Sequence, residues 1–468
     1  MPVTRNGISL TAPTSEEDGE RRSTDGGEGS TSRGVPDSAS TSGTTSTPGP
    51  MFDMSAVLQA TVQAAVEIQG RTKNTLVPPW QFKIMKIYWI LSAVFASHED
   101  YIELGKSQSG DVEIVKAIDY YTEVAKQQRK KIELLQESVC YTGVGCFSRW
   151  DRMTHPIALP QDPQDVGTQF HVYSRQNNDI PTVFTETGPR SIASFAHLFR
   201  EPRKLVVLLH GFTQSVASPW LHYTKASLLK KEDANVILVD WANGCRSPNY
   251  FAAVGNSALI GRQVSLALQS LVRLFPDAVD PANIHVVGFS LGGQASGFCG
   301  RHFLNSTGRS LGRITALDPA GPLFEDSDVH VSKADAIFVD IIHTSYGWNV
   351  LKGDLGMQAA AGHVDFYPNF QERQPGCDSF SLSCRHRRAH KYFVESILSD
   401  SCKFVSTACR PGATDLQCEQ LPRGEMGYGS ERAPGRGEQF LTTNNEPPFC
   451  LPVESGSAVS RYAEHQPE

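Results

Sequence analysis

The sequence predicts an α/β fold in which helices cover both faces of a mostly parallel sheet. From about residue 203 onward, short apolar runs rich in Val, Ile and Leu alternate with longer runs of helical periodicity. This alternation is typical of parallel strands that are buried on both faces. One apolar run leads directly into Gly288-Phe289-Ser290-Leu291-Gly292 at the start of a predicted helix. In sheets of this kind the functional site lies beyond the carboxyl ends of the strands.

The strands and helices predicted in this region alternate along the chain. Strands are expected at residues 204–212, 235–241, 283–290, 313–320 and 336–345. Helices are expected at residues 220–231, 257–275, 291–304 and 387–398. The helix at 257–275 has the clearest pattern, and its apolar face is formed by Val264, Leu268, Leu271, Val272 and Phe275.

The chain before this region divides into three expected parts. Residues 1–84 are expected to be a disordered extension, because their first 50 residues are rich in Ser, Thr, Gly and Pro and bury too little apolar surface to offset the entropy of folding. Residues 85–96 are typical of a secretory signal peptide, with a positive residue before an apolar run and a small-residue cleavage site at Ala96. Residues 97–138 are charged and helix-prone, which predicts a helical pro-segment or linker.

The apolar run at 87–96 leaves alternatives open. It is shorter than the ~20 residues that span a bilayer. It is a signal peptide if translation starts at Met85, a short signal-anchor if residues 1–84 are a cytoplasmic extension, or a core helix. We expect a signal peptide, and therefore a secreted, extracellular protein whose mature form lacks residues 1–96.

The helical segment at 97–138 has an apolar face of its own. Val115, Ile118, Tyr121 and Ala125 fall at roughly helical spacing. A basic run follows at 129–131, which suits a processing site but is better explained as a solvated helix face.

Charge and cysteine content narrow the class of protein. The net charge of -7 argues against a nucleic-acid surface. The ten cysteines form an even set without a C-x-x-C pair, which favours disulfides over a zinc site or buried thiols. Close pairs such as Cys140/Cys146 and Cys377/Cys384 suggest a disulfide framework, and pairing of Cys245 with Cys299 is a guess.

Ser290 is the candidate nucleophile. A G-x-S-x-G sequence between a strand and a helix is typical of a nucleophile elbow, a tight turn that exposes the serine. Gly288 and Gly292 suit this turn because it leaves little space for Cβ atoms. The helix N-terminus after Ser290 helps to hold negative charge when an oxyanion forms.

A serine nucleophile needs a base and a group that orients the base. In elbow enzymes the chain order is Ser, then acid, then His. Asp318 ends the next predicted strand, where Pro319 leaves the carboxylate at the sheet edge. Four of the histidines that follow are candidates, and His386, in a loop after Cys384, is preferred over His343, His363 and His390.

An oxyanion hole needs two backbone N–H donors. Leu291, the residue after the nucleophile, is expected to supply one. Phe212, directly after the first predicted strand, is placed to supply the other.

Several motifs together resemble the pancreatic lipase family of animal α/β-hydrolases. These are "VCYTGVGCFS", "HVVGFSLGG", "ITALDPAGPLF", "GHVDFYPN", "QPGC" and "CRHRRAHKYF", which occur in order over about residues 139–450. The resemblance implies an α/β-hydrolase fold, a triad of Ser290, Asp318 and His386, and N–H donation from Phe212 and Leu291. It also implies a small disulfide loop at Cys140–Cys146 and a lid disulfide at Cys377–Cys384.

The chain departs from this family in two loops and at its C-terminus. We expect the hydrolase domain at 139–405 and a Cys-containing tail at 406–468, without the C-terminal β-sandwich through which some relatives dock colipase. The loop between Cys377 and Cys384 is much shorter than the lid of triglyceride lipases, which predicts a partly open site. The stretch 344–363 is nevertheless as long as in triglyceride lipases.

Two further sites are candidates. Ser332 and Asp335 match part of a calcium-binding pattern of some relatives, although a solvated turn explains them as well. Asn305 begins a glycosylation sequon, Asn305-Ser306-Thr307. No organic cofactor is expected.

The sequence therefore predicts a serine carboxylester hydrolase that acts on lipids at an interface, through peripheral contact with a membrane or lipid droplet. Triacylglycerol lipase-like activity is favoured, with sn-1-specific phospholipase activity as the close alternative. A non-catalytic lipid-binding relative is disfavoured because the triad is intact.

Overall fold

The computed structural model describes residues 108–452, except 133–136, 186, 194, 371–373, 379–380, 400–401, 413–417 and 419. The extension expected at 1–84 and the signal segment expected at 85–96 lie outside these residues. All the described elements belong to the second of two units, Ala96–Glu468.

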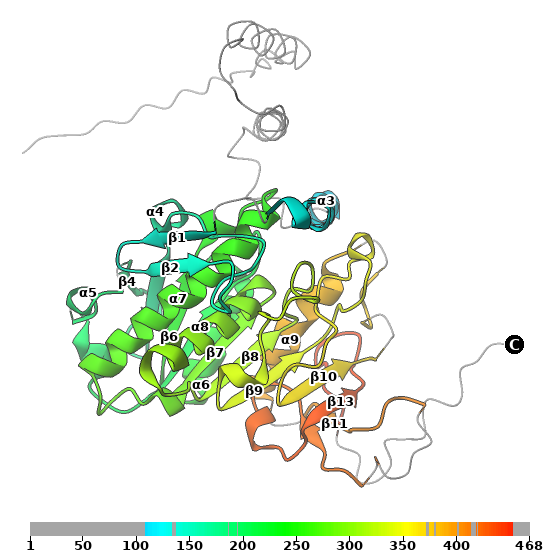
Figure 1. The fold of residues 1–468 in the computed structure, drawn as a ribbon. Coiled ribbons are helices and arrows are strands. Elements are labelled where there is room, and N and C mark those ends of the chain that lie inside the picture. Colours follow the sequence, from blue (N-terminus) through cyan, green and yellow to red (C-terminus); the bar gives the residue numbers. More distant parts are fainter. Residues whose placement is uncertain are drawn as a thin grey trace, which may run out of the picture. The chain divides into compact units, whose positions relative to one another are not determined.

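The centre of this unit is a nine-stranded sheet (Figure 1). Its strands lie in the order β13-β10-β9-β8-β7-β5-β6-β3-β4, and all neighbours are parallel except the pairs β6–β3 and β3–β4. The strands are β3 (Gln169–Tyr173), β4 (Thr182–Phe184), β5 (Lys204–Leu209), β6 (Ala234–Asp240), β7 (Ile284–Phe289), β8 (Arg313–Leu317), β9 (Phe338–Ile342), β10 (Val364–Pro368) and β13 (Gly437–Leu441).

The remaining elements are helices and two small hairpins. The main helices are α3 (Gln108–Ile132), α6 (Pro219–Lys231), α7 (Tyr250–Leu274), α8 (Leu291–Thr307) and α9 (Cys384–Leu398). Short helices are α4 (Pro163–Val166), α5 (Pro189–Ala193), η2 (Ala196–Phe199), η3 (Ala242–Cys245), η4 (Pro281–Asn283), η5 (Lys333–Asp335), η6 (Val350–Lys352) and η7 (Ser430–Arg432). The hairpins pair β1 (Ser138–Tyr141) with β2 (Gly145–Ser148) and β11 (Val405–Ser406) with β12 (Gly424–Glu425).

The sheet is buried on both faces, as its continuous apolar strands predict. Along β5, Leu205, Val207 and Leu209 face a core that also contains side chains of α7 and α8. The alternate residues Val206 and Leu208 face a second core with side chains of α6 and α9. The predicted α/β-hydrolase architecture, a mostly parallel sheet between helices, is confirmed.

The strand order places a site at the carboxyl ends of β5 and β7. From β5 the chain crosses through α6 to β6 on one side, and from β6 it crosses through α7 to β7 on the other side of β5. Such a reversal opens a crevice outside the strand ends, where ligands bind in open α/β sheets. Phe212 follows β5 and Ser290 follows β7, so both residues lie at this crevice.

The chain after residue 405 belongs to the sheet domain, and the boundary expected there is wrong. Residues 437–441 form β13, which pairs in parallel with β10 at the sheet edge. A disulfide joins Cys402 to Cys450, so this segment is also tied covalently to the end of α9. Sequence alternation did not reveal β13 because it is five residues long and is separated from α9 by a small hairpin and the short helix η7.

The structure forms four disulfides: Cys140–Cys146, Cys377–Cys384, Cys402–Cys450 and Cys409–Cys418. The guess that Cys245 pairs with Cys299 is wrong, because both are buried free thiols. Cys245 ends η3 and packs against the backbone of Gly211, whereas Cys299 lies within α8. Burial raises the pKa of both thiols, which keeps them protonated.

Of the helices that the structure describes, none is both long enough and apolar enough to cross a bilayer.

Candidate active site

Ser290 lies on a strained turn between β7 and α8. Its backbone has φ 56° and ψ -122°, a conformation that non-glycine residues rarely adopt. The N–H of Ser290 donates to the carbonyl of Leu317 at the end of β8 (3.1 Å), which holds the turn against the neighbouring strand. This geometry is that of the nucleophile elbow that the G-x-S-x-G sequence predicts.

Two glycines make the turn possible. A Cβ atom on Gly288 would lie 2.1 Å from the carbonyl oxygen of Gly292, and one on Gly292 would lie 2.4 Å from that of Leu209. Both distances are far below van der Waals contact with backbone atoms that cannot move independently. The turn therefore requires glycine at both positions for packing rather than for a positive φ.

Asp318 follows β8 and is completely buried. Its Oδ2 atom lies 2.6 Å from Nδ1 of His386 and also accepts a hydrogen bond from the Ser345 hydroxyl. Its Oδ1 atom accepts the backbone N–H groups of Thr344 (2.6 Å) and Ser345 (3.0 Å). Sequence reasoning missed Thr344 and Ser345, whose donors come from the loop after β9, where no motif marks them.

These bonds keep Asp318 ionised despite its burial. Burial by itself would raise the pKa of this carboxyl group. The hydrogen bond and charge of His386, followed by the bonds from Ser345 and Thr344, outweigh that cost and lower the pKa below its ordinary value.

His386 lies in the first turn of α9 rather than in the loop that we expected, because the helix already begins at Cys384. Its ring packs on Phe289, with the ring centroids 4.5 Å apart. Because Asp318 binds Nδ1, the Nε2 nitrogen is the one left for a proton transfer. His386 and Ser290 line the same pocket.

The other candidate histidines are engaged elsewhere. His343 uses Nε2 on Asp365 (3.0 Å) and Nδ1 on the carbonyl of Met357 (2.7 Å), so neither nitrogen is available. His363 accepts the N–H of Val339 (3.0 Å). His390 lies one turn after His386 and is stacked on Trp220, 5.4 Å away.

Two backbone N–H groups at the crevice are free to bind an oxyanion. Among the described residues, neither the N–H of Phe212 nor that of Leu291 has a hydrogen-bond acceptor. Phe212 is fixed by an edge-to-face contact with Tyr250, whose centroid is 5.1 Å away. Leu291 is the first residue of α8, so its N–H points out of the helix end.

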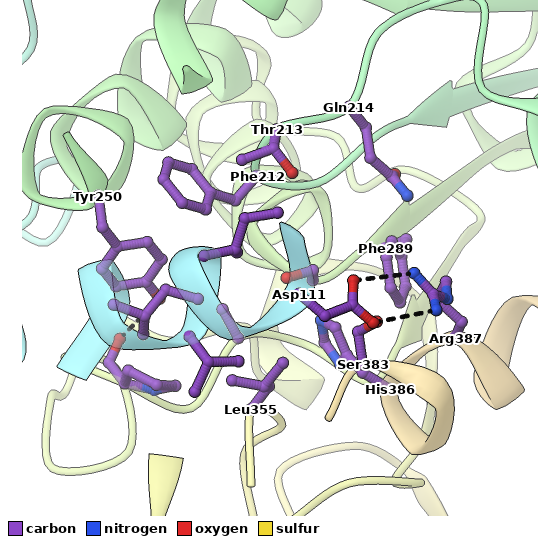
Figure 2. A pocket seen from close by; sticks show the side chains of 16 residues that line it. Asp111, Phe212, Thr213, Gln214, Tyr250, Phe289, Leu355, Ser383, His386 and Arg387 are labelled. Atoms are coloured by element: carbon purple, nitrogen blue, oxygen red, sulfur yellow. Dashed lines mark hydrogen bonds and ion pairs between the residues drawn. The ribbon is translucent and has the colours of Figure 1, made fainter. Parts of the chain in front are cut away.

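Helix α3 lies over the pocket around Ser290 and covers part of it (Figure 2). Asp111, Ile114, Val115 and Ile118 of α3 line it together with residues of the sheet domain. The remaining cavity is about 80 Å³, far below the roughly 300–1,000 Å³ of sites that bind small-molecule ligands. The length of the loop between Cys377 and Cys384 did not reveal this cover, because α3 belongs to another part of the chain.

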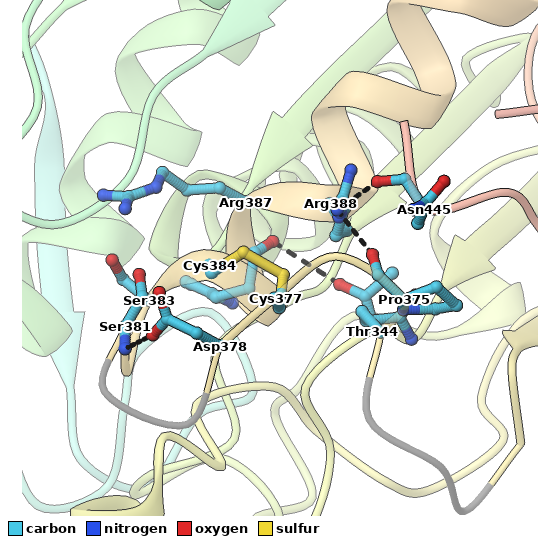
Figure 3. Close-up of a disulfide and its surroundings, with 12 residues drawn as sticks. Thr344, Pro375, Cys377, Asp378, Ser381, Ser383, Cys384, Arg387, Arg388 and Asn445 are labelled. Atoms are coloured by element: carbon cyan, nitrogen blue, oxygen red, sulfur yellow. Dashed lines mark hydrogen bonds between the residues drawn. A yellow bond between two sulfur atoms is a disulfide. The ribbon is translucent and has the colours of Figure 1, made fainter. Parts of the chain in front are cut away.

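Figure 3 shows the Cys377–Cys384 disulfide, and Ser383, at the end of the short loop that it closes, lines the pocket. In this loop, Asp378 accepts the N–H of Ser381 (2.8 Å), and Leu382 packs partly against the core. Residues 379–380, including Phe380, lie outside the described part of the chain.

The two further candidate sites have different outcomes. Both carboxylate oxygens of Asp335 bind the guanidinium of Arg301 (3.0 Å each), and one also accepts the N–H of Ser332. A calcium ion would have to displace this arginine, so the residues do not fit the calcium site considered for Ser332 and Asp335. Asn305 is exposed near the end of α8.

Comparison with known proteins agrees with this geometry. The model of the Lipase family matches residues 137–449. Human pancreatic triacylglycerol lipase is 34% identical over 328 residues, which cover 64% of this chain and 68% of the relative. Pancreatic lipase-related protein 2 of Cavia porcellus is 34% identical over 312 residues, which cover 64% and 69%. The chain therefore belongs to the lipase family and is a carboxylic ester hydrolase of the lipase type.

Proposed function

We propose that Ser290, His386 and Asp318 form the catalytic triad that hydrolyses carboxylic esters of lipids. The observation that carries this proposal is the 2.6 Å contact between His386 Nδ1 and Asp318 Oδ2, at a pocket that Ser290 also lines. The third component, a pair of free N–H groups at Phe212 and Leu291, lies at the same crevice.

The reaction proceeds in two halves. His386 Nε2 takes the proton of the Ser290 hydroxyl as the serine oxygen attacks the acyl carbonyl, and the imidazolium then gives that proton to the leaving alkoxide. Water enters next, His386 takes one of its protons as the water oxygen attacks the acyl carbonyl, and the imidazolium then returns that proton to the Ser290 oxygen as the fatty acid leaves. Asp318 holds the tautomer with the proton on Nδ1 and stabilises the imidazolium. In both halves the N–H groups of Phe212 and Leu291 stabilise the oxyanion.

The substrates that we propose are acylglycerols, with triacylglycerol first and the sn-1 ester of phospholipids as the alternative. The named activity of the pancreatic relatives supports triacylglycerol. The site faces a lipid surface, since acylglycerols of long-chain acids are not available in water. We propose an extracellular location, which the four disulfides of the described chain support.

A substrate panel tests this function. Purified protein is given tributyrin, a long-chain triacylglycerol emulsion and phosphatidylcholine, and released fatty acid is titrated. Ser290→Ala should lower turnover by several orders of magnitude, whereas Ser310→Ala, in the loop after α8, should leave it unchanged. Equal activity of wild type and Ser290→Ala would refute the triad.

A further inference from the structure

Helix α3 is amphipathic, and its apolar face covers the catalytic pocket. Val115, Ile118 and Ala125 are buried at 5% exposure or less, whereas Glu113, Lys116, Glu123 and Lys126 form exposed ion pairs on the opposite face. The helix packs on η6 and on α7, whose first residue, Tyr250, lines the pocket. Sequence reasoning predicted this helix and its face but not what the face covers.

The surface beneath α3 is also apolar. Phe212, Tyr250, Ala320, Pro322 and Leu355 line the pocket opposite the helix. A patch of this kind next to a nucleophile is suited to an acyl chain, and it is unfavourable to expose it to water. The side chains of Ile114, Val115 and Ile118 therefore occupy the place that an acyl chain would take.

One polar contact fixes the first turn of α3 to the catalytic side of the pocket (Figure 2). The carboxylate of Asp111 accepts hydrogen bonds from both terminal nitrogens of the Arg387 guanidinium, with N···O distances of 3.3 and 3.5 Å. It also accepts a hydrogen bond from the hydroxyl of Ser383. Arg387 follows His386 directly in α9, and Ser383 is the residue before that helix. A carboxylate thus occupies an anion site next to the triad histidine.

We propose that α3 is a lid latched by Asp111, and that Arg387 and Ser383 are the receptor for the anionic phosphate headgroup of the lipid that opens it. The proposal rests on the function proposed above. When Asp111 leaves, the phosphate diester of a lipid headgroup can accept hydrogen bonds from the same guanidinium and hydroxyl donors, and it carries one negative charge, as the carboxylate does. The headgroup of this activating lipid then lies at the mouth of the pocket, and the acyl ester of the substrate can reach Ser290.

The released helix remains attached to the protein, and its apolar face can bind a lipid surface. Its C-terminal end leads into β1, so α3 can swing away without leaving the chain. Its apolar face would then enter the lipid, beside Trp348 and Leu351, which are 74% and 52% exposed near η6. A lipid surface therefore compensates for both apolar faces that opening uncovers.

A charge swap tests the latch. Activity is measured on a short-chain ester kept below its solubility limit, so that no interface is present. Asp111→Arg should raise kcat/KM about tenfold by repelling Arg387, Arg387→Asp should do the same, and the double variant should return toward wild type. Glu113→Arg, on the exposed face of the same helix, should have no effect. Single variants that are no faster than Glu113→Arg would overturn the lid.

A second readout does not depend on catalysis. In a Ser290→Ala background, Asp111→Arg should increase the fluorescence of a dye that binds apolar surfaces, and Glu113→Arg should not. If no variant hydrolyses any ester, the proposed function fails while the dye still decides whether α3 opens. If wild type and Asp111→Arg hydrolyse the soluble ester equally and bind dye equally, the function stands and the lid fails.

The headgroup receptor has its own test with wild type and Arg387→Gln. Hydrolysis of a dilute ester is compared in the presence of phosphatidylglycerol vesicles, phosphatidylcholine vesicles and inorganic phosphate. Phosphatidylglycerol should activate wild type several-fold more than phosphatidylcholine, and Arg387→Gln should abolish that difference. Arg385→Gln, at the neighbouring ion pair with Asp354, should keep it. Equal activation by free phosphate, or a difference that survives in Arg387→Gln, would refute a lipid headgroup at this site.

Discussion

The carboxylate of Asp318 receives four hydrogen bonds inside a completely buried site. Burial of a charge is costly unless it is paired and hydrogen-bonded. Two of the donors to Asp318 are backbone N–H groups, and the other two are the Ser345 hydroxyl and the His386 ring. The two backbone donors and the Ser345 hydroxyl leave one direction for His386. Asp318 is thus held ionised and aimed before any substrate arrives.

Asp318→Asn should lower kcat by about 10⁴ with the fold intact. The amide NH₂ group would donate to Nδ1 and move the imidazole proton to Nε2, so that His386 could no longer accept the proton of Ser290. The measurement is kcat on tributyrin together with the circular dichroism spectrum. Asp326→Asn, at an exposed position in the segment after β8, is the matched control. A loss of less than tenfold with native spectra would contradict the proposed role.

Two of the predicted site residues owe their prediction to the ends of strands. Ser290 and Asp318 follow β7 and β8 directly, so strand–helix order alone brings them to one edge of the sheet. Ser345 and Arg387 could not be recognised, because their importance depends on which side chain meets them across 27 and 276 positions of sequence. A hydrogen-bond donor in a loop is not marked by any periodic pattern in the sequence.

Among the longer elements, α3 and β13 lie outside the hydrolase domain that the sequence predicted at 139–405. The sequence of neither element shows which other element it packs against. Helix α3 is amphipathic like any surface helix, and β13 is a five-residue edge strand. Their packing against α7 and β10 is decided by tertiary contacts, which local periodicity does not report. The strands and helices between 204 and 307, whose neighbours are close in sequence, were predicted to within a few residues except for the earlier start of α7.

The disulfide Cys402–Cys450 should contribute more stability than Cys409–Cys418. It closes a segment of 48 positions, against 9 for the second bond. In the chain-entropy account these loops correspond to about 4 and about 2.6 kcal/mol. Replacing both cysteines of each pair by Ser and measuring the free energy of unfolding in urea tests this order. The first variant should also lose protection of the β13 amides from hydrogen exchange, and an equal or reversed order would contradict the assignment of β13 to the domain.

At the scale of the whole molecule, the core contains histidines that are held neutral. Burial, assisted by the charges of Arg313 and Lys204, lowers the pKa of His285 well below its ordinary value. Burial and the charge of Arg387 do the same for His390, between Trp220 and Phe289. Burial lowers the pKa of His302 to about 4. His343 is the opposite case: burial would lower its pKa, but Asp365 outweighs that effect and raises it.

Acidification should therefore destabilise the fold below about pH 6.5. In that range the unfolded chain binds protons at His285, His302 and His390 that the folded protein does not bind, so the free energy of unfolding falls as the pH falls. His343, whose pKa is raised, has the opposite effect, because the folded protein binds its proton more tightly than the unfolded chain does. It is one histidine against three whose pKa is lowered, so the net effect of acid is destabilising.

His390→Phe keeps an aromatic ring between Trp220 and Phe289 and removes one of these protons from the balance. Its unfolding free energy, measured in urea between pH 7 and pH 5, should decrease with a slope shallower than that of wild type by up to about 1.4 kcal/mol per pH unit. Parallel curves for the two proteins would show that His390 is protonated in the folded state, and the account of a neutral histidine core would then be wrong.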